Sequence, residues 1–87
     1  MLYLVGEAYA QAEEHDLATA YFANAIRVDP GWVMPSLALA ESLLQLGRPS
    51  DALRRVRALI RRTPEPGEDV FLLLARSCLA EIGRAHV

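Results

Sequence analysis

Residues 2–30, LYLVGEAYAQAEEHDLATAYFANAIRVDP, contain the pattern that decides the fold of this chain. The first part carries apolar or small residues at the spacing i, i+3, i+4 and i+7: Leu2, Val5, Gly6 and Tyr9. The second part has a similar spacing, i, i+4 and i+7: Ala18, Phe22 and Ala25. Both spacings place their members on one face of an α-helix. The stretch therefore predicts two amphipathic helices joined by a short polar turn.

A second copy of this stretch follows at a shift of 34 residues. Asp29-Pro30 recurs as Thr63-Pro64, and each second helix is predicted to end there because a proline disfavours helical conformation in the residue before it. The apolar faces recur as Leu39, Ala40, Leu43, Ala52, Val56 and Leu59. The chain is therefore built from an internal repeat of two helices.

Polar and small residues recur at matching positions of the two copies. Asp16 and Ser50 are expected to be N-cap residues of the second helices, because their side-chain oxygens can accept hydrogen bonds from the free N–H groups of the first turn. Ala18 and Ala52 are expected to lie where the two helices of each repeat come closest.

A third repeat begins with Phe71, Leu74, Ala75 and Cys78, which restore the first-helix face at a shift of 35 residues. The linker at residues 65–68 is therefore expected to be one residue longer than its counterpart, and no second helix follows. In all, about five helices are predicted, at residues 2–13, 17–29, 34–46, 50–62 and 69–81.

This pattern resembles the tetratricopeptide repeat, whose signature runs large–apolar–small–aromatic along the first helix and small–aromatic–small–Pro along the second. The first repeat has all eight positions, whereas in the second Ser36 replaces a large residue and Leu59 a small one. The resemblance implies an all-α fold in which antiparallel helix–turn–helix repeats stack into a fragment of an α-solenoid. The repeats would span about residues 1–32 and 33–66, with a partial repeat at 67–80.

Composition and motifs argue against several function classes. A net charge of −2 gives no electrostatic basis for binding nucleic acid or an anionic membrane, and no uncharged run reaches the ~20 residues that membrane insertion requires. The single cysteine cannot form an internal disulfide or a zinc cage. The acidic cluster around His15 is expected to be a solvated turn, the alternative being a weak cation site. We expect no enzyme activity, cofactor or metal.

The resemblance implies a protein- or peptide-binding scaffold module within a larger chain. One alternative is a non-catalytic repeat region of a larger enzyme, of the glycosyltransferase or sulfotransferase type. Another is a structural spacer in an envelope secretion assembly. The sequence does not determine the compartment; the cytoplasm is favoured over the periplasm.

The resemblance also implies that the first helices of the pairs line a concave groove. The residues expected there are Tyr3, Leu4, Glu7, Gln11, Met34, Leu37, Glu41, Leu44 and Gln45, joined in the fifth helix by Leu72, Leu73 and Arg76. The family's clamp for a C-terminal carboxylate uses Lys, Arg and Asn on this face, and the first two repeats have none there. Glu7 and Glu41 instead favour an apolar segment that carries Lys or Arg. The alternative is that both glutamates are merely solvated and further repeats cover the apolar residues.

The second repeat also carries a run of arginines: Arg54, Arg55, Arg57, Arg61 and Arg62. Because the apolar face of that helix points to the core, most of these side chains are expected to point outward, on the convex side. A solvated helix face is the favoured interpretation, and a patch for RNA or a phosphoprotein is the alternative.

Residues 81–87, EIGRAHV, are expected to be a non-native tail. The codons GAG ATC GGA AGA GCA CAC GTC followed by TGA would encode them, and this is the start of a common sequencing adapter. The natural sequence is then expected to continue beyond Ala80. The alternative is that Gly83-Arg84 echoes Gly47-Arg48. Recovery of these codons in an intact genomic locus would rule out the adapter explanation.

Overall fold

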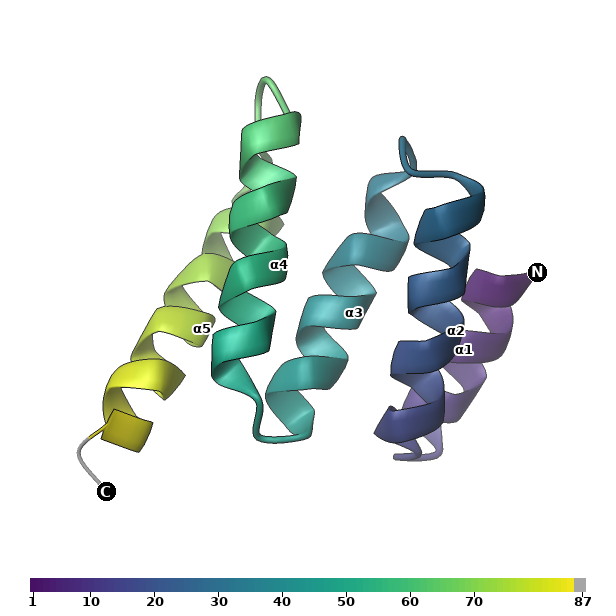
Figure 1. The fold of residues 1–87 in the computed structure, drawn as a ribbon, viewed down its shortest axis with the longest axis horizontal. Coiled ribbons are helices and arrows are strands. Elements are labelled where there is room, and N and C mark those ends of the chain that lie inside the picture. The colour runs from purple at the N-terminus through teal and green to yellow at the C-terminus, as the bar shows by residue number, and fades with distance from the viewer. Residues whose placement is uncertain (86–87) are drawn as a thin grey trace.

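The structure, a computed structural model, describes the backbone of residues 1–85 and the side chains of residues 1–83. Its helices are α1 (Leu2–Gln11), α2 (His15–Val28), α3 (Val33–Gln45), α4 (Pro49–Arg62) and α5 (Glu68–Ala85) (Figure 1). The predicted all-α fold is confirmed, and the helix ends lie within two residues of the predicted ones, except at the C-terminus of α5. That helix continues into the expected tail, of which residues 86–87 lie outside the described part.

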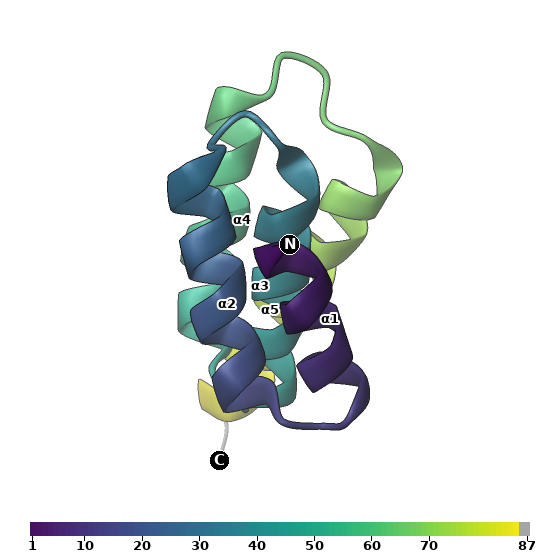
Figure 2. The same ribbon diagram turned by 90° about the vertical axis from the view of Figure 1, so that its right-hand side faces the viewer.

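Consecutive helices pack side by side in an antiparallel stack (Figure 1). In addition, α1 contacts α3 and α3 contacts α5, whereas α2 and α4 make no such contact in the described part of the chain. The first helices of the repeats therefore lie on the inner, concave side of the stack. Figure 2 shows this division, with α2 and α4 on one side and α1, α3 and α5 on the other.

Two apolar clusters hold the stack together. The first joins α2, α3 and α4 and consists of Ala18, Phe22, Leu39, Leu43 and Ala52. The second joins α3, α4 and α5 and consists of Ala40, Val56, Leu59, Val70 and Leu73. Full burial of a large apolar side chain stabilises a fold by about 1.5–3 kcal/mol. Each cluster draws on two successive repeats, so neighbouring repeats stabilise one another.

The expected ends of the second helices are confirmed, and their expected beginnings are wrong. Asp29 and Thr63, each followed by proline, have left the helical conformation, with ψ angles of 81° and 115°. However, Asp16 and Ser50 are not N-cap residues, because α2 and α4 begin before them, and the residues at the N-cap positions, Glu14 and Arg48, make no side-chain capping hydrogen bond. Pro49 is the first residue of α4, a position where its fixed φ already suits a helix.

The predicted core face of α5 is also wrong. Val70, Leu73 and Ser77 are buried, whereas Phe71 is 50% exposed. The buried residues lie 34 positions beyond Ser36, Leu39 and Leu43, so the core face keeps the period of 34. The segment between α4 and α5, residues 63–67, is one residue longer than the segment between α2 and α3, residues 29–32, because α5 begins one residue later in its repeat. Because residues 70–75 are apolar without interruption, the sequence offers two possible faces, and the regular continuation of the stack selects one of them.

A smaller correction concerns Val5 in the first repeat. This residue was expected in the core but is 36% exposed. Among the described helices α1 contacts only α2 and α3, so one side of α1 remains uncovered.

Candidate functional site

An open hollow of about 450 Å³ lies on the inner face, between α1, α3 and α5. Its apolar lining comes from Met34, Leu37, Ala38, Leu72 and Leu73. Its charged lining comes from Glu7, Glu41, Asp69 and Arg76. The packing of α1 on α3 and of α3 on α5 brings these residues together from three helices that are far apart in the sequence.

A second hollow, of about 320 Å³, adjoins the first one. Glu7, Ala38 and Glu41 line both hollows and form the boundary between them. Gln11 and Gln45 line the second hollow, near the C-terminal ends of α1 and α3. We refer to the two hollows together as the inner groove.

The structure places seven of the nine groove residues named from the sequence around the inner groove. Tyr3, Glu7, Met34, Leu37 and Glu41 line its first hollow, and Gln11 and Gln45 its second. The other two lie elsewhere. Leu4 is 65% exposed and lines neither hollow, and Leu44 packs against both apolar clusters. Leu44 therefore holds α3 to its neighbours.

An ion pair crosses the groove between α3 and α5. The guanidinium of Arg76 donates two hydrogen bonds to the carboxylate of Glu41, with N···O distances of 2.6 and 3.1 Å. The two side chains are 50% and 41% exposed, so solvent screens the pair, and it stabilises the fold by about 1 kcal/mol or less. No ion pair involves Glu7 or Asp69 among the residues whose side chains are described. The charge of Glu41 is therefore balanced by Arg76, whereas no cation among the described side chains balances that of Glu7.

The tetratricopeptide repeat family model matches residues 9–77, from within α1 to within α5. The chain belongs to the tetratricopeptide repeat family. A search of the curated proteins found no match, and neither did a search of the solved structures. Because tetratricopeptide repeats act as scaffolds for protein interactions, the family assignment makes this chain a module of the protein-interaction type.

Within this tetratricopeptide stack, the acidic groove residue of the first repeat recurs in the second repeat but not in the third. Glu7 and Glu41 are 34 residues apart and therefore equivalent, and the next equivalent position is Ala75. Arg76, its neighbour, reaches back to Glu41 instead. Asp69, in the first turn of α5, was not anticipated as a groove residue, although an acidic residue at a helix N-terminus is a recognisable signal.

Tyr3, which lines the first hollow near the N-terminus of α1, contacts two other aromatic rings. The ring centroids of Tyr3 and Trp32 are 4.9 Å apart, and Tyr3 also lies 5.8 Å from Phe22. Partial burial raises the pKa of the Tyr3 hydroxyl, and the negative charge of Glu7 one turn away raises it further. Both causes favour the protonated, neutral form of the Tyr3 phenol.

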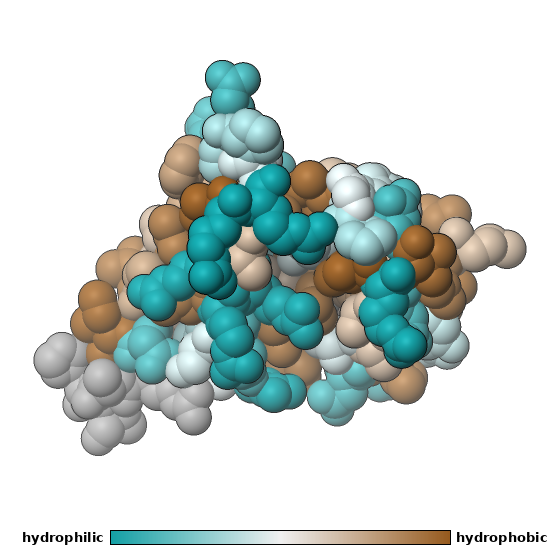
Figure 3. Space-filling view, turned by 45° about the horizontal axis from the view of Figure 1, so that its top comes forward, coloured by the Kyte–Doolittle hydropathy of each residue, from teal (hydrophilic) through white to brown (hydrophobic). Residues whose placement is uncertain are grey.

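The arginine run lies on the opposite side of the tetratricopeptide stack, on α4, and its side chains are exposed as predicted. Arg54 donates to Asp51 at 2.9 Å, and Arg62 donates to the backbone carbonyl of Pro30 at 2.8 Å. Figure 3 shows hydrophilic side chains over the α4 region with hydrophobic surface on both sides of them.

The described part of the chain contains no cluster of three His, Cys, Asp or Glu side chains that could hold a metal ion. Among the described helices, none has the length and apolar character needed to cross a membrane. The inner groove itself combines an apolar floor with charged side chains.

Proposed function

We propose that this tetratricopeptide module binds an apolar peptide segment carrying Lys or Arg in the inner groove. One observation carries the proposal: the first hollow of the groove combines an apolar floor with three carboxylates, from Glu7, Glu41 and Asp69, against one guanidinium, from Arg76. Acidic peptides would meet net repulsion there, and basic ones net attraction.

Apolar contacts and charges have different roles in this proposal. Burial of ligand side chains on Met34, Leu37 and Leu72 supplies most of the affinity, at about 25 cal/mol per Å² of apolar surface removed from water. Exposed ion pairs add about 1 kcal/mol or less each, but like charges in close contact are costly. The carboxylates therefore contribute more to the specificity of binding than to its affinity.

A peptide selection tests the proposal. Random peptides are displayed, selected on the wild-type chain and on Glu7→Lys/Glu41→Lys, and sequenced. We expect wild type to enrich peptides that combine Leu, Ile or Met with Lys or Arg, and the double variant to enrich Asp or Glu instead. Glu65→Lys is the matched control, because Glu65 is exposed in the α4–α5 loop and lines neither hollow.

The proposal fails in two ways that the selection can reveal. Acidic peptides selected by wild type would contradict the charge argument. A preference that is the same in wild type and in the double variant would mean that the ligand lies outside the inner groove. Circular dichroism of each variant establishes that the helices are intact.

A further inference from the structure

The charges of this chain are distributed unevenly along its helices. Residues 48–62, which form α4 and the residue before it, carry six arginines and one aspartate, a net charge of +5. Residues 1–47, which form α1, α2 and α3 with their turns, carry one arginine and six carboxylates, a net charge of −5. The net charge of −2 for the whole chain therefore conceals one strongly basic helix in an otherwise acidic molecule.

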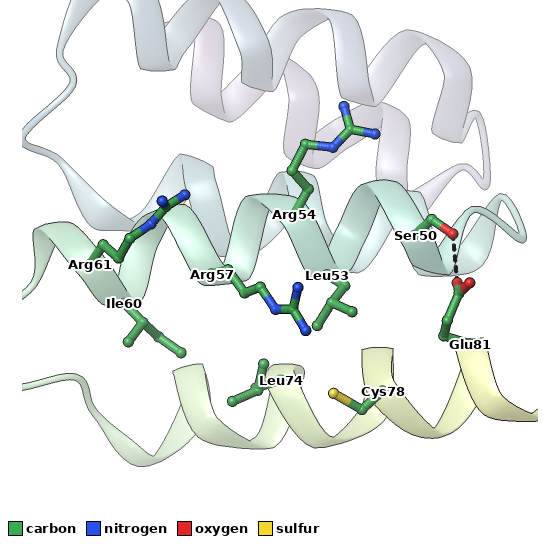
Figure 4. A pocket seen from close by; sticks show the side chains of 9 residues that line it. All are labelled: Ser50, Leu53, Arg54, Arg57, Ile60, Arg61, Leu74, Cys78 and Glu81. Atoms are coloured by element: carbon green, nitrogen blue, oxygen red, sulfur yellow. Dashed lines mark hydrogen bonds between the residues drawn. The ribbon is translucent and has the colours of Figure 1, made fainter.

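Four of these arginines surround one small residue on the outer side of α4. Ala58 has an arginine at each of the positions that neighbour it on a helix surface, i−4, i−3, i+3 and i+4. The four are Arg54, Arg55, Arg61 and Arg62, and all are exposed. Figure 4 shows Arg54 and Arg61 extending from α4 on the side away from α5, whereas Arg57 points into the hollow between the two helices. We call the four residues around Ala58 the arginine ring.

We propose that the arginine ring binds a phosphorylated side chain of a partner protein. This inference is independent of the inner groove, which lies on the opposite side of the stack. It rests on the contacts of the four guanidinium groups, on the equivalent positions of α2 and on the small extent of the basic surface.

A single carboxylate lies within ion-pair distance of the ring among the described side chains. Asp51 accepts a hydrogen bond from Arg54 at 2.9 Å, and it also pairs with Arg48, outside the ring, at 2.6 Å. The ring has a charge of +3 even when the whole charge of Asp51 is assigned to it. It therefore keeps a positive charge that the fold itself does not balance.

The guanidinium groups of Arg55 and Arg61 are free to bind a ligand. Neither makes an ion pair or a side-chain hydrogen bond with a residue whose side chain is described. Arg62 donates a hydrogen bond of 2.8 Å to the backbone carbonyl of Pro30, which leaves its positive charge uncompensated. Because Arg55 and Arg61 lie three residues before and three residues after Ala58, their long side chains can close on one group above it.

Further repeats stacked on α5 would leave the ring open. The equivalent positions of α2, 34 residues earlier, show this, because α2 already has the next repeat packed behind it. These positions are Ala20, Tyr21, Arg27 and Val28 around Asn24, and all but the half-buried Tyr21 are exposed. They include one arginine, so the packing of a second helix in this stack does not require four. The ring is therefore both accessible in a longer stack and unnecessary for the fold.

The small extent of the basic surface favours a phosphate monoester as the ligand. Such a group carries about two negative charges at neutral pH and three acceptor oxygens, and the planar fork of an arginine binds these oxygens through two parallel hydrogen bonds. A carboxylate offers a single charge. A nucleic acid strand also has a single charge per phosphodiester, and beyond α4 its further phosphates would meet the acidic charges of residues 1–47. A single phosphorylated side chain matches the ring in both charge and size.

Three synthetic peptides test this proposal. Each is about ten residues long, roughly 33 Å when extended, and consists of Gly, Ala and Ser with phosphoserine, glutamate or serine at its centre. We expect the phosphoserine peptide to bind with a dissociation constant at least about tenfold lower than that of the glutamate peptide. Its affinity should fall as salt is raised, because the ring is exposed. The serine peptide should not bind.

Charge reversal on α4 locates the site. Arg61→Glu should weaken binding of the phosphoserine peptide about tenfold or more, and so should Arg55→Glu. Arg27→Glu is the matched control, because Arg27 is exposed at the position of α2 equivalent to Arg61 and its reversal changes the net charge equally. It should change the affinity about twofold or less. Circular dichroism of each variant establishes that the helices are intact.

NMR of the 15N-labelled chain gives a direct readout of the position. The phosphoserine peptide should change the amide chemical shifts of Arg55, Ala58 and Arg61 and leave those of Glu7 and Glu41 in the inner groove unchanged. Shifts centred on the inner groove, equal affinity for the phosphoserine and glutamate peptides, or equal effects of Arg27→Glu and Arg61→Glu would each overturn the proposal. So would a short single-stranded uridine RNA that binds the ring as tightly as the phosphoserine peptide, because nucleic acid would then be the ligand.

Discussion

Glu13 and Gly47, 34 residues apart, occupy the same left-handed position in the turns that follow α1 and α3, with φ angles of 62° and 73°. The hydrogen bonds of the two turns correspond as well. Glu13 and Gly47 donate to the carbonyls of Ala10 and Leu44, and the residues after them donate to Tyr9 and Leu43. Both turns are thus the same helix C-terminal motif, in which a left-handed residue is required and glycine is best suited.

Substitutions at these two positions should have opposite effects. Glu13→Gly should stabilise the fold, and Gly47→Ala should destabilise it, each by about 1 kcal/mol, because a side chain is strained in the left-handed region. No atom lies within 4 Å of a Cβ added at Gly47, so the cost comes from the backbone alone. Urea unfolding measures both effects. Gly31→Ala, at a glycine without positive φ, is the control and should change little.

Gly6 is required by the ring of Phe22. A Cβ added at Gly6 would lie 2.6 Å from Cε1 of that ring, and the ring is 1% exposed and cannot move aside. We expect Gly6→Ala to destabilise the fold by about 1–3 kcal/mol, despite the better helix propensity of alanine. In the double variant Gly6→Ala/Phe22→Leu the two losses should not add, since the smaller side chain relieves the overlap. Fully additive losses would show that the overlap is not the cause.

Ala52 tests the assigned face of α4. Ala52 is fully buried in the first apolar cluster, whereas Arg55 is exposed. Ala52→Leu should overpack the cluster and cost about 1–3 kcal/mol, whereas Arg55→Ala should cost less than about 0.5 kcal/mol. Equally mild effects in thermal or urea unfolding would mean that the helix face is wrongly assigned.

Tyr3 should make stability depend on pH in the alkaline range. Its pKa is raised in the folded state, first by burial and then by the charge of Glu7, so the folded protein holds the phenolic proton more tightly than the unfolded chain. The associated stability is fully present below about pH 10, the ordinary tyrosine pKa, and is lost as pH rises through the raised pKa.

Two variants check this assignment for Tyr3. Tyr3→Phe should show a smaller loss of stability than wild type when urea unfolding is compared below and above about pH 10. Glu7→Gln should lower the pKa of Tyr3 only part of the way, because burial is the larger cause. An NMR titration of the Tyr3 ring measures that pKa directly. An unchanged alkaline stability profile in Tyr3→Phe would contradict the assignment.

The sequence predicts the core positions and helix ends of this fold well because the repeat signature occurs twice. Ala18, Phe22 and Leu39 lie in the core as expected, and the prolines end the second helices. The errors arise where local patterns are ambiguous. The apolar run at residues 70–75 fits two helix faces. The correct face is hard to recognise in the sequence because it includes a polar residue, Ser77, at the position equivalent to Tyr9 and Leu43.

The groove was accessible from the sequence only in part. Its members on α1 and α3 follow from helical spacing, so Glu7 and Glu41 could be named in advance. The ion pairing of Glu41 could not be predicted, because its partner, Arg76, lies 35 positions away on another helix. The side-chain direction of Leu44 likewise depends on how α3 packs against its neighbours.

The central claim, that the inner groove binds an apolar and basic segment, is tested most directly by NMR. The 15N-labelled chain is titrated with a synthetic peptide of leucine and lysine, about ten residues long, enough to span the stack at ~3.3 Å per residue. We expect the amide chemical shifts of Glu7, Leu37, Glu41 and Leu72 to change on binding. An otherwise identical peptide with glutamate in place of lysine should bind more weakly. The variant Arg76→Ala should bind the lysine peptide more tightly than wild type, because it leaves Glu41 without its ion-pair partner. Shifts confined to α2 and α4, or equal binding of both peptides, would contradict the claim.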